Sequence, residues 1–300
     1  MEVSLSYYSL NQYLQDKFGC KVYKIALNGG FTCPNRDGTI DTRGCIFCSV
    51  GGSGDFAGDP EKSIQEQIED GKRLISSKIR DGKYIAYFQA YTNTYGPIEK
   101  LRTLYEEAIH YPDIAALSIA TRPDCLPEEV LDLLEELNQI KPVWVELGLQ
   151  TIHEKTAQYI RRGYPLAKYD EAVRKLQARG LDVITHVILG LPGESKEDMK
   201  ETVAYVCSHQ ANGIKLQLLH ILEGTDLAEE YKEGKFSVMS EDEYVSLLME
   251  LLAVIPDNIV IHRLTGDGSK KDLIDPMWSG NKKQVLNHIQ KALKEANSFQ

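Results

Sequence analysis

Three of the six cysteines in this 300-residue sequence lie close together near its N-terminus. They are Cys33, Cys45 and Cys48, all within the stretch "FTCPNRDGTIDTRGCIFC" at residues 31–48. Two thiolates separated by two residues can bind one metal centre, and a third thiolate from the same loop brings the protein ligands to three. This stretch therefore predicts a metal site. The remaining cysteines stand alone in the sequence, and we interpret them as buried side chains: Cys20, Cys125 and Cys207.

The identity of the metal depends on how many protein ligands the loop supplies. A closed structural zinc site has four protein ligands, but this loop contains no histidine and no fourth cysteine. The seven histidines lie far away in the sequence, between positions 110 and 288. A cubane iron–sulfur cluster with three cysteine ligands leaves one iron atom open to a small molecule. The spacing therefore favours an iron–sulfur cluster that takes part in chemistry, with zinc as the alternative.

The composition is typical of a globular chain with an acidic surface. Hydrophobic residues make up 42% of the sequence, which is enough for a sizeable core. Thirty-four basic and 44 acidic side chains give a formal charge of −10, which argues against indiscriminate nucleic-acid binding but permits a local basic patch. No stretch approaches the roughly 18 to 20 apolar residues of a membrane-spanning helix, and the N-terminus is too polar for a signal peptide. We therefore expect a cytoplasmic protein that does not enter a membrane.

Short β-rich runs alternate with helical patterns along most of the chain. The runs lie at residues 21–28, 84–90, 115–120, 143–149, 181–189 and 214–219. Between them, residues 126–140 repeat apolar side chains at helical spacing, and Ser195 is suited to cap a helix that follows it. Strands that are apolar on both faces and alternate with helices predict an α/β fold with a parallel sheet. The sheet is expected to form either an open doubly wound structure or a full or partial barrel.

The carboxyl ends of the predicted strands carry unusually polar turns. After the cysteine loop come "QAYTNTYG", "ATRPD", "ELGLQT", "HVILGLPGE" and "LLHILEGT". Because the carboxyl ends of parallel strands meet at one face, we expect these side chains to surround a single site. We assign the site to a core of residues 21–239, flanked by an N-terminal extension (1–20) and a C-terminal extension (240–300). The C-terminal extension contains a further strand-like run at 258–264.

The cysteine loop after the first strand, with Phe47 directly before the last cysteine, resembles that of the radical S-adenosylmethionine enzymes. Most of that superfamily has three residues between the first two cysteines, whereas this chain has eleven. The long loop resembles one branch, which includes the Elongator catalytic subunit and a bacterial group with the opening "GGFTCPNRDGT". The resemblance covers roughly residues 10 to 295. It implies a partial (βα)6 TIM-like barrel, a [4Fe–4S] cluster held by the three cysteines, and S-adenosylmethionine as the second cofactor.

The resemblance also implies which residues bind S-adenosylmethionine. Arg162 follows Gln150 by twelve residues, the same interval as in the similar oxygen-independent coproporphyrinogen oxidases, and His186 stands where those enzymes carry a carboxylate near the ribose. The Gly-Gly-Glu stretch that usually holds the amino group of the cofactor is absent, so polar residues are assigned there by position. The full set of expected cofactor-binding residues is Gln89, Tyr91, Thr92, Asn93, Thr121, Arg122, Glu146, Gln150, Arg162, His186, Leu189 and Gly190.

The bacterial group with this opening looks like enzymes that act on the modified wobble uridine of transfer RNA, and this implies tRNA as the partner. The residues expected to contact the substrate lie between positions 262 and 278, where cations accompany an aromatic side chain: His262, Arg263, Lys270, Lys271 and Trp278. His262 and Arg263 are also the candidate catalytic residues. An electron donor such as flavodoxin or ferredoxin is expected. The alternatives are a radical enzyme for a small metabolite or porphyrin-like compound, and a non-catalytic metal-binding interaction module.

Overall fold

The computed structural model describes residues 7–78, 82–266 and 268–298, so the first six residues of the predicted N-terminal extension lie outside it. Among the described residues, the main element is a seven-stranded parallel sheet in the order β1-β2-β3-β4-β5-β6-β8. Its strands are β1 (Val22–Leu27), β2 (Lys83–Phe88), β3 (Ile114–Thr121), β4 (Val143–Gln150), β5 (Asp182–Leu189), β6 (Gly213–Leu218) and β8 (Val260–Arg263). A small antiparallel sheet pairs β7 (Ile221–Leu222) with β9 (Leu273–Asp275).

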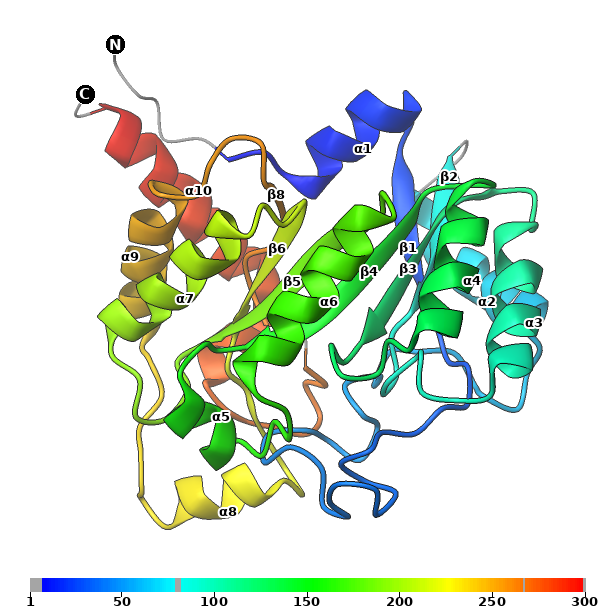
Figure 1. Cartoon of the computed structure of the whole chain (residues 1–300). Helices are drawn as coiled ribbons and strands as arrows, with labels where there is room; N and C mark the ends of the chain where they lie inside the picture. Colours follow the sequence, from blue (N-terminus) through cyan, green and yellow to red (C-terminus); the bar gives the residue numbers. More distant parts are fainter. Residues whose placement is uncertain (1–6, 79–81, 267, 299–300) are drawn as a thin grey trace.

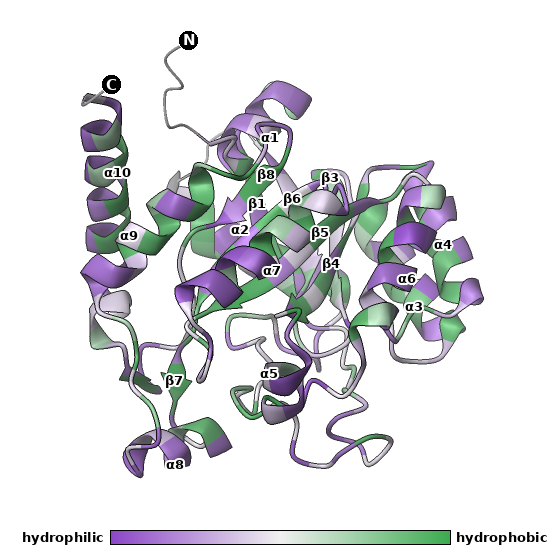
Figure 2. Cartoon of the chain, turned by 60° about the vertical axis from the view of Figure 1, so that its left-hand side comes forward, coloured by the Kyte–Doolittle hydropathy of each residue, from purple (hydrophilic) through white to green (hydrophobic). Residues whose placement is uncertain are grey.

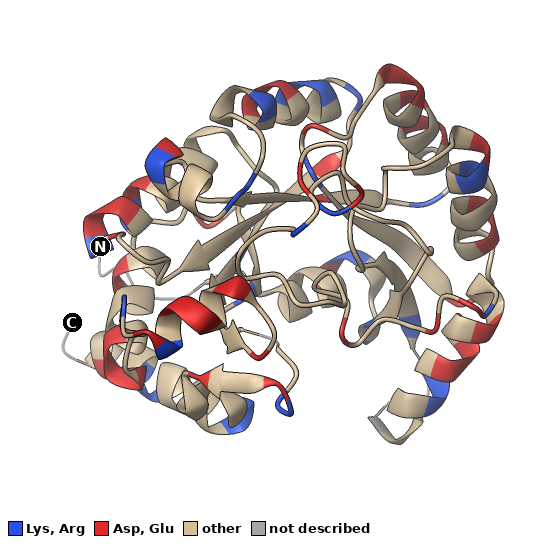
Figure 3. Ribbon diagram, turned by 90° about the horizontal axis from the view of Figure 1, so that it is seen from below, with Lys and Arg blue, Asp and Glu red and all other residues tan. Residues whose placement is uncertain are grey.

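Helices cover the outer side of the curved sheet (Figures 1 and 3). The α-helices are α1 (Leu10–Phe18), α2 (Ile64–Ile75), α3 (Ile98–Ile109), α4 (Glu128–Asn138), α5 (Glu154–Tyr159), α6 (Leu166–Ala178), α7 (Lys196–Ser208), α8 (Asp226–Lys232), α9 (Glu241–Leu252) and α10 (Lys282–Ser298). Two short 3₁₀ helices span Ser76–Lys78 and Met277–Gly280. In Figure 2 the strands are mainly hydrophobic, while the helices show hydrophilic stripes. The amphipathic pattern of the helices therefore decides which side faces the sheet.

Local sequence explains these elements. Every residue of β3 is buried, as expected for a strand that is covered on both faces. The predicted cap of α7 is present: the Ser195 hydroxyl accepts a hydrogen bond from the Asp198 backbone at 3.2 Å, and the Asp198 carboxylate accepts one from the Ser195 backbone at 2.7 Å. The predicted partial TIM-like barrel is thus confirmed, with each of the six expected strands placed within two residues of its prediction.

The C-terminal extension contributes a seventh strand to the sheet. β8 pairs in parallel with β6, and this strand corresponds to the strand-like run predicted at residues 258–264. At the amino ends of the strands, α1 packs Leu14 against a cluster that contains Trp144 and Ile184. The amino ends are therefore covered, and the loops at the carboxyl ends form the accessible side of the barrel. In Figure 1 the cysteine loop, α5 and α8 lie together on that side. None of the helices in the described ranges has the length and apolar character to cross a membrane.

Candidate active site

A cavity of about 240 Å³ opens at the carboxyl ends of the strands. It brings together most of the residues that the sequence singled out: Cys33, Cys45, Cys48, Gln89, Tyr91, Thr92, Thr121, Arg122, Glu146, Gln150, Arg162, His186 and Arg263. Seven other expected site residues do not line it: Asn93, Leu189, Gly190, His262, Lys270, Lys271 and Trp278. The prediction that several strand ends converge on one site is therefore correct.

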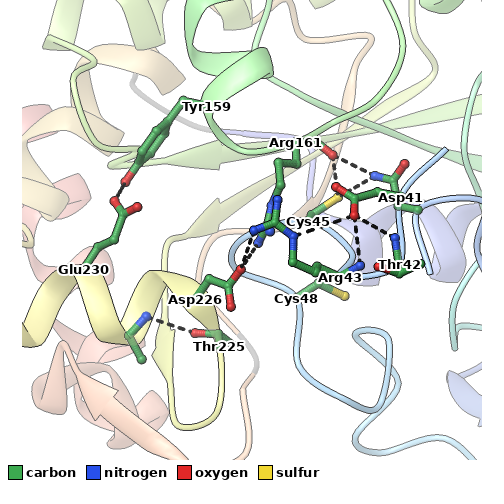
Figure 4. A network of polar contacts seen from close by, with 12 residues as sticks. Asp41, Thr42, Arg43, Cys45, Cys48, Tyr159, Arg161, Thr225, Asp226 and Glu230 are labelled. Atoms are coloured by element: carbon green, nitrogen blue, oxygen red, sulfur yellow. Dashed lines mark hydrogen bonds and ion pairs between the residues drawn. The ribbon is translucent and has the colours of Figure 1, made fainter. Parts of the chain in front are cut away.

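The second half of the cysteine loop is held between α5 and α8. Ile46 donates a backbone hydrogen bond to the Ile160 carbonyl at 3.2 Å and accepts one from the Leu227 amide at 3.0 Å. The Arg161 guanidinium lies 2.6 Å from the Asp226 carboxylate at the start of α8, as Figure 4 shows. The loop that carries the cysteines is thus fixed by segments from two distant parts of the chain.

The three thiols are not arranged as ligands of a single zinc ion. Their sulfur atoms do not form a group that lies mutually within 4.8 Å. Thiolates bound to one zinc ion at about 2.3 Å in a tetrahedral site would lie only about 3.8 Å apart. In an iron–sulfur cluster each thiolate binds a different iron atom, and the sulfur atoms are farther apart. The arrangement of Cys33, Cys45 and Cys48 therefore does not match a zinc site built from these three thiolates.

The residues at the end of β2 hold the loop that follows the last cysteine. Gln89 Nε2 donates to the Ser53 carbonyl at 2.9 Å, and the Tyr91 hydroxyl donates to the Val50 carbonyl at 2.5 Å. Asn93, by contrast, is fully buried away from the cavity and donates to the Phe88 and Ala120 carbonyls at 3.0 and 2.9 Å. The structure therefore gives Asn93 a structural role between β2 and β3, in place of the expected contact with the cofactor.

The two arginines beside the thiols already have partners within the chain. Arg122 forms a two-point contact with the Asp124 carboxylate at 2.9 and 2.8 Å. Arg162 donates to the Thr151 carbonyl at 2.6 Å and to the Tyr164 carbonyl at 3.0 Å. Arg122 thus holds the turn after β3 and Arg162 the segment after β4, and the contact of either with the cofactor stays a prediction.

Gln150 is the polar residue at the end of β4 that lacks a partner. Its backbone has a φ of 69°, a left-handed conformation that is uncommon for residues other than glycine. Its Oε1 atom is buried without a hydrogen-bond partner among the described residues, and the side chain lines the cavity. A buried acceptor of this kind is costly unless a ligand or water binds it. Gln150 therefore fits the amino or hydroxyl groups of S-adenosylmethionine.

Charged side chains form a layer deeper in the barrel. We call Lys24 on β1, Glu146 on β4, His186 on β5 and Lys215 on β6 the inner charged layer. Each lies three or four residues before the end of its strand, which places the layer about 10 to 13 Å below the strand ends at about 3.3 Å per residue. Glu146 and His186 line the cavity and form its floor, and the two lysines lie behind them.

Glu146 is the centre of this layer. Its Oε1 accepts hydrogen bonds from Lys24 Nζ and from Ser118 Oγ, both at 2.6 Å. Its Oε2 accepts from His186 Nε2 at 2.7 Å and from Lys215 Nζ. Because an ionised carboxylate can only accept, His186 donates from Nε2. Both oxygens are thus occupied by donors of this chain, and a contact between Glu146 and the cofactor stays a prediction.

Burial and charge set the protonation of the layer. Although burial opposes ionisation of Glu146, the charges of Lys215 and Lys24 hold the pKa of its carboxyl well below the usual range. Burial, together with the charge of Lys215, lowers the pKa of His186 to about 4. Burial also lowers the pKa of Lys215 well below the value of an ordinary lysine. At neutral pH Glu146 is therefore ionised and His186 is neutral.

Several residues expected to contact the substrate or the cofactor lie outside the cavity lining. Trp278 packs its ring 5.7 Å from that of Tyr244 and donates from Nε1 to the Met239 carbonyl at 3.1 Å, so it does not offer a free face in the cavity to stack a base. His262 packs edge-on against Trp144, with ring centroids 5.8 Å apart. Leu189 is buried in the core at the end of β5. Gly190 follows it with a φ of 90° and serves the turn.

Lys270 and Lys271 are exposed and lie close in sequence to Gly268, which lines the cavity. They are therefore placed at the surface beside the mouth of the cavity rather than within it. Their expected contact with the substrate stays a prediction, and any such contact would be to a part of the substrate outside the cavity.

Sequence reasoning missed Lys24 and Lys215, which pair with Glu146 behind the floor of the cavity. Each is a charged residue within an otherwise apolar strand, in "KVYKIALN" and "IKLQLL". A charge at a position that the strand pattern buries is rare without a partner, and this was the available signal. Both ammonium groups also lie over the ring of Tyr87, at 4.7 and 4.6 Å from its centroid.

Comparison with protein families accounts for the cysteine loop and the barrel together. The model of the Radical SAM superfamily matches residues 38–206, and the model of the Radical_SAM C-terminal domain matches residues 211–295. This chain belongs to the radical SAM superfamily. Its cofactors are accordingly a [4Fe–4S] cluster and S-adenosylmethionine. The spacing of the three thiols and the unpartnered acceptor of Gln150 fit these two groups.

Similar proteins extend the comparison beyond the superfamily. The uncharacterized protein YtqA of Bacillus subtilis is 49% identical over 98% of this chain and 91% of its own length. The tRNA uridine(34) acetyltransferase of Methanocaldococcus jannaschii is 26% identical over 61% of this chain but only 34% of its own length. The solved structure of the archaeal Methanocaldococcus infernus Elp3 has a TM-score of 0.67 at 19% identity and covers 90% of this chain and 63% of that one. The last comparison shows a shared fold.

Proposed function

We propose that this radical SAM protein modifies the wobble uridine of transfer RNA by converting its 5-carboxymethylaminomethyl group to 5-aminomethyl. The observation that carries the proposal is the match to a tRNA uridine(34) acetyltransferase, an enzyme named for action on the same uridine. The match covers about a third of that enzyme, so its acetyl-transfer activity is not part of the proposal. The reaction we propose instead uses the chemistry of the radical SAM cofactors.

When bound, the reduced cluster and S-adenosylmethionine supply a 5′-deoxyadenosyl radical that removes a hydrogen atom. In the proposed reaction, the methylene next to the substrate carboxylate would give this hydrogen atom to the 5′-deoxyadenosyl radical, which becomes 5′-deoxyadenosine. The substrate radical would then give up one electron, for which the oxidised cluster would serve as the acceptor, and one proton from nitrogen, which would leave a carbon–nitrogen double bond. Water hydrolyses this imine to aminomethyl uridine and glyoxylate. The first reduction of the cluster requires an electron donor such as flavodoxin or ferredoxin.

The residues of this chain bind and orient the reactants. In the proposal Cys33, Cys45 and Cys48 hold the cluster at the mouth of the cavity, and Gln150 contacts S-adenosylmethionine. The uridine substituent enters the cavity below them. The exposed pair Lys270 and Lys271 lies beside the mouth, where it can meet the phosphate backbone of the RNA. Such a local patch allows RNA binding by a chain whose formal charge is −10.

The test is an anaerobic reaction of the reconstituted protein with S-adenosylmethionine, a reductant and bulk tRNA. Mass spectrometry would measure 5′-deoxyadenosine and the modified nucleosides. We expect 5′-deoxyadenosine to form, carboxymethylaminomethyl uridine to fall and aminomethyl uridine to rise. A matched reaction without S-adenosylmethionine would show that any change in the nucleosides depends on radical chemistry.

Other outcomes would contradict separate parts of the proposal. If 5′-deoxyadenosine forms but no nucleoside changes, the tRNA substrate is wrong, and a small metabolite or porphyrin-like compound becomes the next candidate. If a fully loaded cluster yields no 5′-deoxyadenosine with any reductant, radical catalysis by this chain is refuted. The remaining reading would then be a metal-binding interaction module.

A further inference from the structure

The groups at and behind the floor of the cavity carry more positive than negative charge. Lys24 and Lys215 each form an ion pair with Glu146, at 2.6 Å for Lys24. Among the described residues, Glu146 is the one carboxylate within ion-pair distance of either lysine. The side chain of Lys215 is 3% exposed and that of Glu146 is fully buried, so solvent screens these charges poorly. Two ammonium groups therefore share one carboxylate.

Arg263 adds a further cation at the same level. It is the register partner of Lys215 across β6 and β8, and its side chain lines the cavity. Arg263 Nη1 lies 3.4 Å from Gln217 Oε1, another atom of the cavity wall. The guanidinium has five donors in a planar fork, a geometry that matches the two oxygens of a carboxylate. The guanidinium of Arg263 is thus a group of the cavity wall whose geometry suits a carboxylate.

Glu146 does not turn this floor into a site for a cation. Four donors of the chain occupy its two oxygens, and His186 presents a neutral ring to the cavity. A ligand that reaches the floor consequently meets the positive potential of the lysines and the guanidinium of Arg263. Excess buried charge of one sign is costly, and an anionic ligand relieves that cost.

We propose that the cavity floor beside Arg263, Gln217 and His186 is a subsite for a carboxylate of the substrate, with Lys24 and Lys215 supplying positive potential from behind. This inference rests on the proposed function, because the carboxymethylaminomethyl substituent ends in a carboxylate. The floor lies about 10 to 13 Å below the strand ends. A carboxylate bound there points the adjacent methylene back toward the cysteine loop, and Glu146 acts as a positioning residue that holds the two lysines.

The first experiment tests the subsite without RNA. Thermal unfolding of the reconstituted protein with S-adenosylmethionine would be measured in acetate and in acetamide, its neutral analogue, at equal ionic strength. We expect acetate to raise the midpoint and acetamide to leave it unchanged, since a ligand that binds the folded state stabilises it. Arg263→Gln and Lys215→Met should weaken acetate binding about tenfold or more, while Arg263→Lys retains part of it. Lys294→Gln, which removes an exposed charge on α10, is the matched control.

Equal shifts of the thermal unfolding midpoint in acetate and in acetamide would refute the proposed carboxylate subsite. So would an acetate effect of full size in both Arg263→Gln and Lys215→Met. Two variants are needed because Lys215 is buried and its replacement affects folding, whereas Arg263 is partly exposed.

The second experiment separates the subsite from the proposed function. Anticodon stem-loops would carry either the carboxymethylaminomethyl group or a methylaminomethyl group, which lacks the carboxylate. We expect Arg263→Gln to raise KM about tenfold for the carboxylated RNA and to abolish the preference for it. If the carboxylated RNA is processed with the same KM by wild type and variant, the subsite is wrong and the function stands. If no RNA is processed but acetate binding depends on Arg263, the subsite stands and the function is wrong.

Discussion

Replacing Glu146 by glutamine tests whether one carboxylate holds the inner charged layer together. Glu146→Gln keeps the size of the side chain and removes its charge. It leaves Lys215, whose side chain is 3% exposed, and Lys24, whose side chain is 19% exposed, without a carboxylate partner among the described residues. Removing one partner of a buried ion pair costs about 3–5 kcal/mol. Because domains of ordinary stability unfold with about 5–15 kcal/mol, we expect a large fraction of the stability to be lost.

The loss of stability caused by Glu146→Gln should depend on pH. Burial already lowers the pKa of Lys215 below its unfolded value, and the loss of Glu146 lowers it further. When the pKa of a basic side chain is lower in the folded than in the unfolded state, the free energy of unfolding decreases as the pH falls. The reason is that the unfolded chain binds a proton that the folded chain does not. The difference in unfolding free energy between variant and wild type should therefore be larger at pH 7 than at pH 9.5.

Urea unfolding of the protein without its cluster, followed by circular dichroism at both pH values, is the assay. The double variant Glu146→Gln/Lys215→Met should recover part of the loss because it removes both partners of the pair. The control is Glu128→Gln, an exposed carboxylate that contacts Lys175 and Arg179, where we expect almost no change. A loss below about 1 kcal/mol for Glu146→Gln, or an equal loss at both pH values, would refute the reasoning.

Three further predictions concern the cluster and the floor. Cys45→Ala should abolish reconstitution of the cluster, measured by iron content and absorbance, while Cys125→Ala should retain both; loss of iron in both variants would contradict our ligand assignment. His186 should lower the free energy of unfolding by up to about 3 kcal/mol as the pH falls from 6.5 to 4, because its pKa in the folded protein is about 4. Urea unfolding of His186→Gln should lack this part of the pH dependence, and an unchanged profile would speak against it. Asp226→Asn removes the ion pair with Arg161 and should speed iron release to a chelator about two- to fivefold, whereas an unchanged rate would show that α8 does not secure the loop.

The sequence by itself determined the class of the fold and the mouth of the site. Apolar runs at regular intervals require a parallel sheet covered on both faces, and the carboxyl ends of such strands converge whatever the details of packing. Cys33, Cys45 and Cys48 are near one another in sequence, so their proximity in space needed little tertiary information. Gln150 lies in the polar turn "ELGLQT", and the resemblance to the coproporphyrinogen oxidases implied both Gln150 and Arg162 through their interval of twelve residues.

Only the tertiary structure decided which polar side chains face the cavity and which form hydrogen bonds within the protein. The backbone carbonyls of Thr151 and Tyr164 occupy the donors of Arg162, a contact that no spacing in the sequence specifies. Trp278 packs into the C-terminal segment, where the Met239 carbonyl accepts its indole hydrogen.

The inner charged layer illustrates the physical reason. Lys24, Glu146 and Lys215 are up to 191 residues apart in the numbering and meet because their strands curve around one interior. A strand pattern tells which residues are buried but not which buried charges face one another. The register and the curvature of the sheet set that pairing, and with it the charge at the floor of the cavity.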